Sequence, residues 1–179
     1  MLVGRDGRGA GPTASERRNA ISIVVKLEFE GKSILFTGDT VGRRLSDPDD
    51  ACKDAEKIMV DRNDDYPLKA DVLIAPHHGG NNGSSKCFLE AVLPKFVVFS
   101  AGHEYGHPSK GTAKRAQNAG VRKSNIFRTD RGDDEDSIFE WKEGSVDGCK
   151  DGRGDDDVEI VLPRTGNVRV EYRRASSGC

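Results

Sequence analysis

Short apolar runs mark the predicted strands of this chain. Residues 21–29 hold six apolar positions, most of them β-branched, which is typical of a largely buried strand. A turn signal at 30–32 and a second apolar run at 33–36 predict that these segments form a hairpin. Three further runs predict additional strands, at residues 72–75, 96–99 and 125–128.

Amphipathic segments separate these predicted strands. Residues 49–62 begin with acidic side chains, continue with basic ones and place apolar residues at helical spacing, so they predict a helix. Residues 84–92, which open with a serine cap, and residues 109–119, which end before Gly120, predict two more helices. Alternation of strand and helix is the pattern of parallel βαβ units with helices covering the sheet.

The ends of the chain and one internal segment lack this periodicity. Residues 1–18 are rich in glycine and predict a disordered lead, and residues 173–179 predict a tail. Residues 130–157 hold 12 acidic against 4 basic residues, which predicts a solvated insertion. A last hairpin is expected from strands at 158–162 and 168–172. The expected organisation is therefore one α/β domain over residues 19–172.

Composition limits the classes of function. The 179 residues are 35% hydrophobic and 32% charged, which suffices for one modest core. No apolar run reaches the roughly 18 residues of a membrane helix and no signal peptide is recognisable, so we expect a soluble chain, cytoplasmic by default. A net charge of −2 gives no electrostatic attraction that would favour non-specific nucleic-acid binding. It does not exclude a nucleic-acid substrate that is held through a metal.

The spacing of the cysteines is typical of neither a metal site nor a disulfide framework. They lie far apart and form no CxxC pair, so we expect free thiols in a reducing compartment. The four positions are Cys52, Cys87, Cys149 and Cys179.

Polar candidates for chemistry follow three of the predicted strands. Asp39 comes after the strand that ends near Phe36, and the pair His77-His78 comes after the strand that ends near Ala75. His103 and His107 follow the strand at 96–99. Ligands of α/β sheets bind where the carboxyl ends of the strands converge, so we expect these side chains to meet at one edge.

Each candidate also has a structural interpretation. Asp39 fits a turn residue or a helix N-cap as well as it fits a role in chemistry. His77 and His78 form an exposed loop pair if the backbone is extended, because only one of them then points inward. His107 belongs to a turn before the predicted helix at 109–119. Taken together, histidine nitrogens and a carboxylate form a donor set suited to Zn, Mn or Fe.

Several short motifs occur in a recognisable order along residues 19–130. They are N-x-x-S at 19–22, FTGD at 36–39, ADVL at 70–73, PHHG at 76–79, YGHP at 105–108 and FRTD at 127–130. This order resembles the metallo-β-lactamase-fold hydrolases and, among them, the ComEC-type DNA-uptake competence proteins. The resemblance implies an αββα sandwich of two similar halves with metals between them. This chain resembles the C-terminal half, a mixed sheet with helices on one face.

The resemblance also implies roles for individual residues. The TGD aspartate bridges two metal ions in that family, which places this role on Asp39. The HHG segment supplies a histidine to the second metal, assigned to His77 with His78 as the alternative. His107 resembles a histidine that borders the site and contacts metal or substrate. The implied cofactor is divalent Zn or Mn, and the implied substrate is a phosphodiester or another ester, DNA among them.

One family feature is absent from the 179 residues. The first metal-binding motif, HxHxDH, does not occur, and all four histidines are already placed. We therefore expect an incomplete metal site, little hydrolase activity in this chain alone, and an exposed sheet face that pairs with the missing N-terminal half or with itself. The alternative is a non-catalytic binding or assembly module that kept the half-fold.

Overall fold

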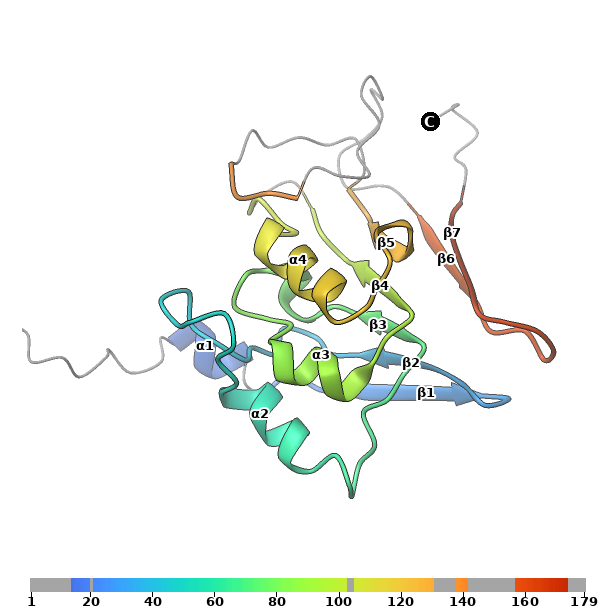
Figure 1. The fold of residues 1–179 in the computed structure, drawn as a ribbon, viewed down its shortest axis with the longest axis horizontal. Helices are drawn as coiled ribbons and strands as arrows, with labels where there is room; N and C mark the ends of the chain where they lie inside the picture. Colours follow the sequence, from blue (N-terminus) through green and yellow to red (C-terminus); the bar gives the residue numbers. More distant parts are fainter. Residues whose placement is uncertain (1–13, 20, 103–104, 131–137, 142–156, 174–179) are drawn as a thin grey trace, which may run out of the picture.

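A five-stranded mixed sheet organises the protein (Figure 1). The computed structural model describes residues 14–19, 21–102, 105–130, 138–141 and 157–173. Strand β1 is antiparallel to β2, and the remaining neighbours are parallel. The mixed α/β sheet expected from the sequence is confirmed. In spatial order the strands are β1 (Val25–Phe29), β2 (Lys32–Phe36), β3 (Val72–Ile74), β4 (Phe96–Phe99) and β5 (Ile126–Arg128).

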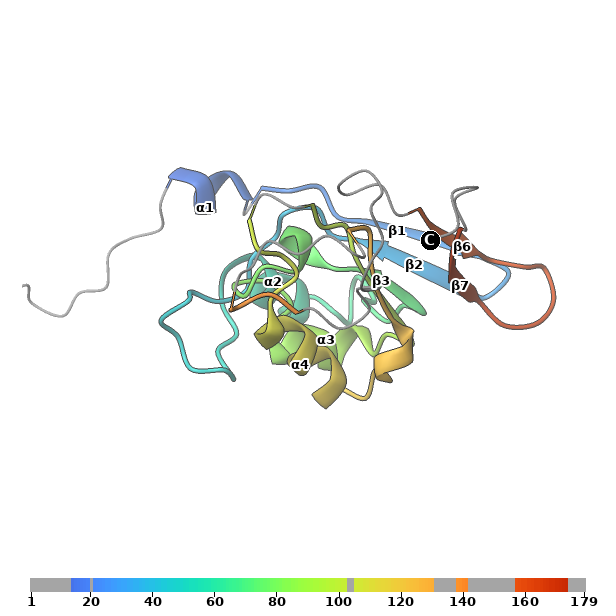
Figure 2. The same cartoon turned by 90° about the horizontal axis from the view of Figure 1, so that it is seen from above.

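Three helices connect the parallel strands and lie on one face of the sheet (Figure 2). They are α2 (Asp54–Asp61), α3 (Lys86–Val92) and α4 (Lys110–Asn118). Crossovers between parallel strands are right-handed, so connections that always step in the same direction place all their helices on the same side. Helix α2 begins later than the predicted residue 49, because Lys53 is extended and donates its N–H to the Gly42 carbonyl. Among the described residues, no helix is long and apolar enough to cross a membrane.

The sheet contributes a different set of side chains to each of two apolar layers. Leu35, Leu73 and Val97 occupy paired positions and pack against the helices. The neighbouring positions Ile34, Val72 and Val98 point the other way, because side chains alternate along a strand. A separate hairpin covers this second face and confirms the predicted closing hairpin. Its strands are β6 (Val158–Val161) and β7 (Arg169–Tyr172).

The hairpin leaves the β1 end of that face uncovered. Val25, Leu27 and Phe29 lie on the same face as Ile34 and are 50%, 45% and 39% exposed. Phe36, paired with Val25, is 40% exposed. The prediction of a largely buried first strand is therefore wrong, because apolar periodicity identifies a strand without showing what covers it. The expected exposed apolar sheet face is therefore confirmed only at its β1 end, because the hairpin covers the rest of that face.

A disulfide ties the segment before α2 to the first turn of α3. It joins Cys52 to Cys87, whose Cα atoms lie 6.0 Å apart and whose sequence separation is 35 residues. The prediction of free thiols is wrong for this pair, because spacing along the chain does not reveal which cysteines meet in the fold. Cys149 and Cys179 lie outside the described residues.

A short helix occupies the last part of the predicted lead. Helix α1 (Ala14–Asn19) forms where a disordered segment was expected up to residue 18. Turn hydrogen bonds from Ile21 and Ser22 to the carbonyls of Arg18 and Asn19 continue the chain from this helix toward β1. Residues 1–13 of the predicted lead, and residues 174–179 of the predicted tail, lie outside the described residues.

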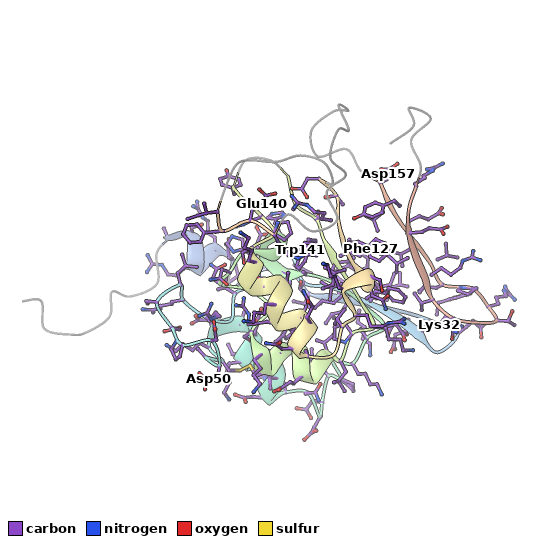
Figure 3. The ribbon with its side chains drawn as sticks, turned by 45° about the horizontal axis from the view of Figure 1, so that its top comes forward. Lys32, Asp50, Phe127, Glu140, Trp141 and Asp157 are labelled. Carbon is purple, nitrogen blue, oxygen red and sulfur yellow. A yellow bond between two sulfur atoms is a disulfide. The ribbon has the colours of Figure 1, made fainter. Side chains whose placement is uncertain are left out.

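Part of the predicted acidic insertion is packed rather than solvated. Asp130 and Glu140 are fully buried and Trp141 is 5% exposed. Figure 3 shows Glu140 and Trp141 over the middle of the molecule, whereas Asp50 and Asp157 lie toward its periphery. The predicted solvated character is therefore wrong for these three buried residues. The rest of the insertion, at 131–137 and 142–156, lies outside the described residues.

Candidate functional site

The carboxyl ends of β2, β3 and β4 converge on the sequence-predicted candidates. Asp39 follows β2, His77 and His78 follow β3, and His107 lies in the loop after β4. The His77 ring centroid is 6.4 Å from that of His78 and 5.8 Å from that of His107. A contact of 3.3 Å between His78 Nε2 and Asp39 Oδ1 brings the carboxylate into the same group. His103 lies outside the described residues.

The turn that carries Asp39 is anchored on both sides. The Asp39 N–H donates to the Ser22 hydroxyl at 3.1 Å, and the Gly38 carbonyl accepts the His77 N–H at 3.0 Å. Gly38 has a φ of +54°, and a Cβ added there would lie 3.1 Å from the Ser22 Cβ. Glycine therefore meets both the backbone conformation and the close approach of Ser22 at this turn.

The two adjacent histidines both adopt the left-handed backbone conformation. Their φ angles are +50° for His77 and +56° for His78, and Gly79 follows at +80°. Non-glycine residues in this region are uncommon and carry strain, which is concentrated at functional sites. Because the segment is not extended, the argument that only one histidine can point inward does not apply. Both imidazoles contact other candidate residues.

His78 is the histidine that meets Asp39. Its Nδ1 lies 2.6 Å from the Ser100 carbonyl oxygen and its Nε2 lies 3.3 Å from Asp39 Oδ1. A carbonyl oxygen only accepts, so Nδ1 carries the hydrogen, and Nε2, on the other side of the ring, lies beside the Asp39 carboxylate. Metal-binding histidines are commonly oriented by such a backbone carbonyl. The donor set of this pair therefore fits a divalent cation.

His77, the histidine assigned to metal by resemblance, has different contacts. Its Nδ1 lies 2.7 Å from Asn82 Oδ1, so it donates to that oxygen. Its Nε2 lies 3.4 Å from Asn19 Nδ2, which places the helix α1 amide beside the lone pair. No pattern in the sequence points to Asn82. Asn19 belongs to the N-x-x-S motif at 19–22, and its spacing to Ser22 is the signal that could have indicated its place at the site.

His107 lies at the edge of this group. Its ring centroid is 5.8 Å from that of His77 and 6.3 Å from that of Tyr105. Burial lowers the pKa of His107 below its usual value, and the charges of His77 and His78 act in the same direction, against Asp130. The lowered pKa favours the neutral imidazole of His107 at pH 7.

A buried ionic network supports the loop that carries His107. Arg128 donates to both oxygens of Asp130 at 2.7 and 2.8 Å and to Glu140 Oε1 at 2.6 Å. Glu140 forms a β-bridge with Ser109, and the Trp141 N–H donates to the Pro108 carbonyl at 2.7 Å. The FRTD motif thus supplies a buried ion pair, whose Asp130 is close enough to act electrostatically on His107.

Taken alone, the described residues do not form a complete metal cluster. No group of three or more His, Cys, Asp or Glu side chains among them is arranged to hold a metal ion. The described donor set is the pair Asp39 and His78, with His77 and His107 beside it.

Comparisons with known proteins agree with this architecture. The chain is similar to competence protein ComA of Neisseria gonorrhoeae, with 31% identity over 122 residues that cover 65% of this chain and 16% of that protein. It is also similar to ComE operon protein 3 of Bacillus subtilis (strain 168), with 29% identity over 117 residues that cover 64% of this chain and 13% of that protein. The chain thus matches about a sixth or less of the length of these relatives. No solved structure matches it significantly.

A family model covers more than half of the chain. The model for the metallo-beta-lactamase superfamily matches residues 10–103, which include the Asp39 turn and the His77-His78 segment. The chain belongs to the metallo-beta-lactamase superfamily.

Proposed function

We propose that this chain provides one side of the metal site of a phosphodiester hydrolase related to DNA-uptake competence proteins. The observation that carries the proposal is the 3.3 Å contact between His78 Nε2 and Asp39 Oδ1, with His78 Nδ1 held by the Ser100 carbonyl. This geometry favours His78 over His77 as the histidine ligand. The resemblance to DNA-uptake competence proteins, together with the name of one relative, competence protein ComA, supports DNA as the phosphodiester.

Zn and Mn fit the proposed donor set, because both bind imidazole nitrogen and carboxylate oxygen. A divalent ion at such a site lowers the pKa of bound water to about 7. Catalytic zinc sites commonly have three protein ligands, whereas Asp39 and His78 supply two. The HxHxDH motif is absent from the 179 residues. We therefore expect weak metal binding and little hydrolysis by this chain alone.

A metal-binding titration tests the site. Calorimetry with Mn²⁺ and with Zn²⁺ should show weak binding to the wild type, reduced about ten-fold or more in Asp39→Ala and His78→Ala. Asp61→Ala is the matched control for the carboxylate, because Asp61 is exposed on α2 and pairs with Lys57. His77→Ala is the comparison for the histidine. Equal affinity in the wild type and Asp39→Ala, or a larger loss in His77→Ala than in His78→Ala, would contradict the assignment.

The uncovered sheet face favours a second candidate function, assembly without catalysis. Val25, Leu27, Phe29 and Phe36 form an apolar strip that would be buried by a separate polypeptide segment bearing HxHxDH or by another copy of this chain. Light scattering after size exclusion should show association. A stable monomer at all concentrations would contradict self-association through this face.

Mixing the chain with a first-half fragment that bears HxHxDH separates the two candidates. The hydrolase proposal predicts that the mixture cleaves a bis-aryl phosphodiester with Mn²⁺ or Zn²⁺ and that Asp39→Ala abolishes cleavage while Asp61→Ala does not. A stable complex without turnover would instead support the assembly module.

A further inference from the structure

A carboxylate lies fully buried behind the histidine segment. Glu56, in the first turn of α2, is 0% exposed, and its two oxygens accept the backbone N–H groups of Ser84 and Ser85 at 2.7 Å each. Gly42 packs directly against it, since a Cβ added at Gly42 would lie 1.9 Å from Glu56 Oε2. A carboxylate with no solvent contact and two charge-assisted hydrogen bonds is costly to bury and specific in what it holds.

A buried cation also binds the segment that Glu56 contacts, residues 80–85. Arg115 of α4 donates its Nε hydrogen to the Ser84 carbonyl at 3.0 Å and its Nη2 hydrogens to the carbonyls of Asn81 and Gly83 at 3.0 and 2.9 Å. The Glu56 carboxylate thus accepts hydrogen bonds from N–H groups of this segment, while the Arg115 guanidinium donates to its carbonyls. Opposite charges fix the two kinds of backbone dipole in one short loop.

Asn82 connects this loop to the candidate site. Its carbonyl accepts the N–H groups of Gly42 and Arg43 at 3.0 and 3.1 Å, and its side-chain oxygen accepts the His77 Nδ1 hydrogen at 2.7 Å. Asn82 is two residues from Ser84, and Gly42 contacts both Asn82 and the Glu56 carboxylate. We therefore expect a displacement of the Glu56 carboxylate to move Asn82 in two ways, through Ser84 in the same loop and through Gly42, which donates to the Asn82 carbonyl.

We propose that Glu56 is a positioning residue for the candidate site, whose buried carboxylate fixes the 80–85 loop and, through Asn82, the orientation and tautomer of His77. Glutamine is the informative replacement, because it keeps the shape of the side chain but turns one of its two acceptors into a donor. That donor would face a backbone N–H, so one hydrogen bond is lost and two donors are opposed.

The environment of Glu56 makes its ionisation observable near neutral pH. Burial raises the pKa of Glu56 from 4.5 to about 7, against the hydrogen bonds from Ser85 and Ser84 and the positive charge of Arg115. Two other charged groups face Glu56 and Arg115. Arg43 lowers the pKa of Arg115, whereas Asp49 raises it.

Nuclear magnetic resonance of the metal-free chain tests the proposal. The Nδ1 hydrogen of His77 should give a protected signal in the wild type and lose that protection in Glu56→Gln. Glu90→Gln is the matched control, because Glu90 is exposed on α3 and pairs with Lys86. A folded Glu56→Gln variant that keeps the His77 signal and the Asn82 chemical shifts of the wild type would overturn the proposal.

A wild-type titration gives a second test that needs no substitution. The ¹³C signal of the Glu56 carboxyl defines the midpoint of its ionisation, and the Ser84, Ser85 and Asn82 amide signals should shift with that same midpoint. An Asn82 signal that follows only the His77 ring midpoint would overturn the proposal.

Failure of the proposed function is distinguishable from failure of this inference. The inference rests on the proposed function only for the role of the histidine segment, and both resonance experiments are made without metal. A wild-type chain that binds neither Mn²⁺ nor Zn²⁺ would contradict the proposed function, whereas the His77 signal in Glu56→Gln decides the positioning role.

Discussion

Gly79 provides a quantitative test of how the histidine segment is packed. Its φ is +80°, and a Cβ added there would lie 2.5 Å from Phe99 Cδ1 and 2.6 Å from Pro108 Cβ. Alanine in the left-handed region costs about 1–2 kcal/mol, and overpacking a filled core adds about 1–3 kcal/mol. Phe99 is fully buried against Trp141, so its ring has no open space into which to move. We expect Gly79→Ala to lower the free energy of unfolding by about 2–5 kcal/mol.

Gly120→Ala is the matched control for this substitution. Gly120 also has a positive φ, +97°, but nothing lies within 4 Å of a Cβ added there. Its replacement should therefore cost only the conformational part, about 1–2 kcal/mol. Urea unfolding followed by the fluorescence of Trp141, the one tryptophan in the chain, measures both variants. Equal destabilisation of the two variants would refute the tight packing of Gly79.

Three further predictions concern the disulfide and two buried charged groups. Replacing both Cys52 and Cys87 by alanine should lower the free energy of unfolding in urea by about 2–4 kcal/mol, because their disulfide closes a loop of 35 residues; an unchanged urea midpoint would contradict the disulfide. Because the folded-state pKa of Glu56 is raised to about 7, its contribution to stability is present below pH 4.5 and is lost as pH rises through 7. Urea unfolding at pH 4.5 and at pH 7 should show that the free energy of unfolding of the wild type falls by about 3 kcal/mol more than that of Glu56→Gln. Parallel pH profiles of the two proteins would refute this. Arg128→Met should lower the free energy of unfolding by about 3–5 kcal/mol by removing the guanidinium that pairs with two buried carboxylates, with Arg128→Lys less damaging; a thermal melt as stable as the wild type would rule out the network.

The order of strands and helices could be predicted because each run carries its own periodicity. The βαβ alternation needed no knowledge of distant contacts, and the predicted strands coincide with β2 to β5 within a few residues. Helix α2 is shorter than predicted because residues 42 and 53 pair with each other outside the helix. Its true start depends on a tertiary hydrogen bond that helical periodicity does not reveal.

The environment of each element was harder to predict than its type. The apolar residues of β1 have the pattern of a buried strand, yet Val25 and Leu27 are about half exposed because the β6–β7 hairpin stops short of them. The pairing of Cys52 with Cys87 likewise depends on how α2 and α3 pack. Asp130 and Glu140 belong to an acidic segment, and both pair in the core with Arg128, which composition does not identify.

Position in the sequence could place two histidines at the site, but it could not distinguish their roles. His78 donates its Nδ1 hydrogen to the carbonyl of Ser100, the residue directly after β4, so the sheet itself sets that ring. His77 donates to the side chain of Asn82, so its ring depends on the 80–85 loop and on the charges that grip it. Disturbing Glu56 should therefore alter His77 and leave His78 facing Asp39. Disturbing Gly79, which follows both rings, should alter both, so the two substitutions separate a histidine held by the sheet from one held by a buried ionic loop.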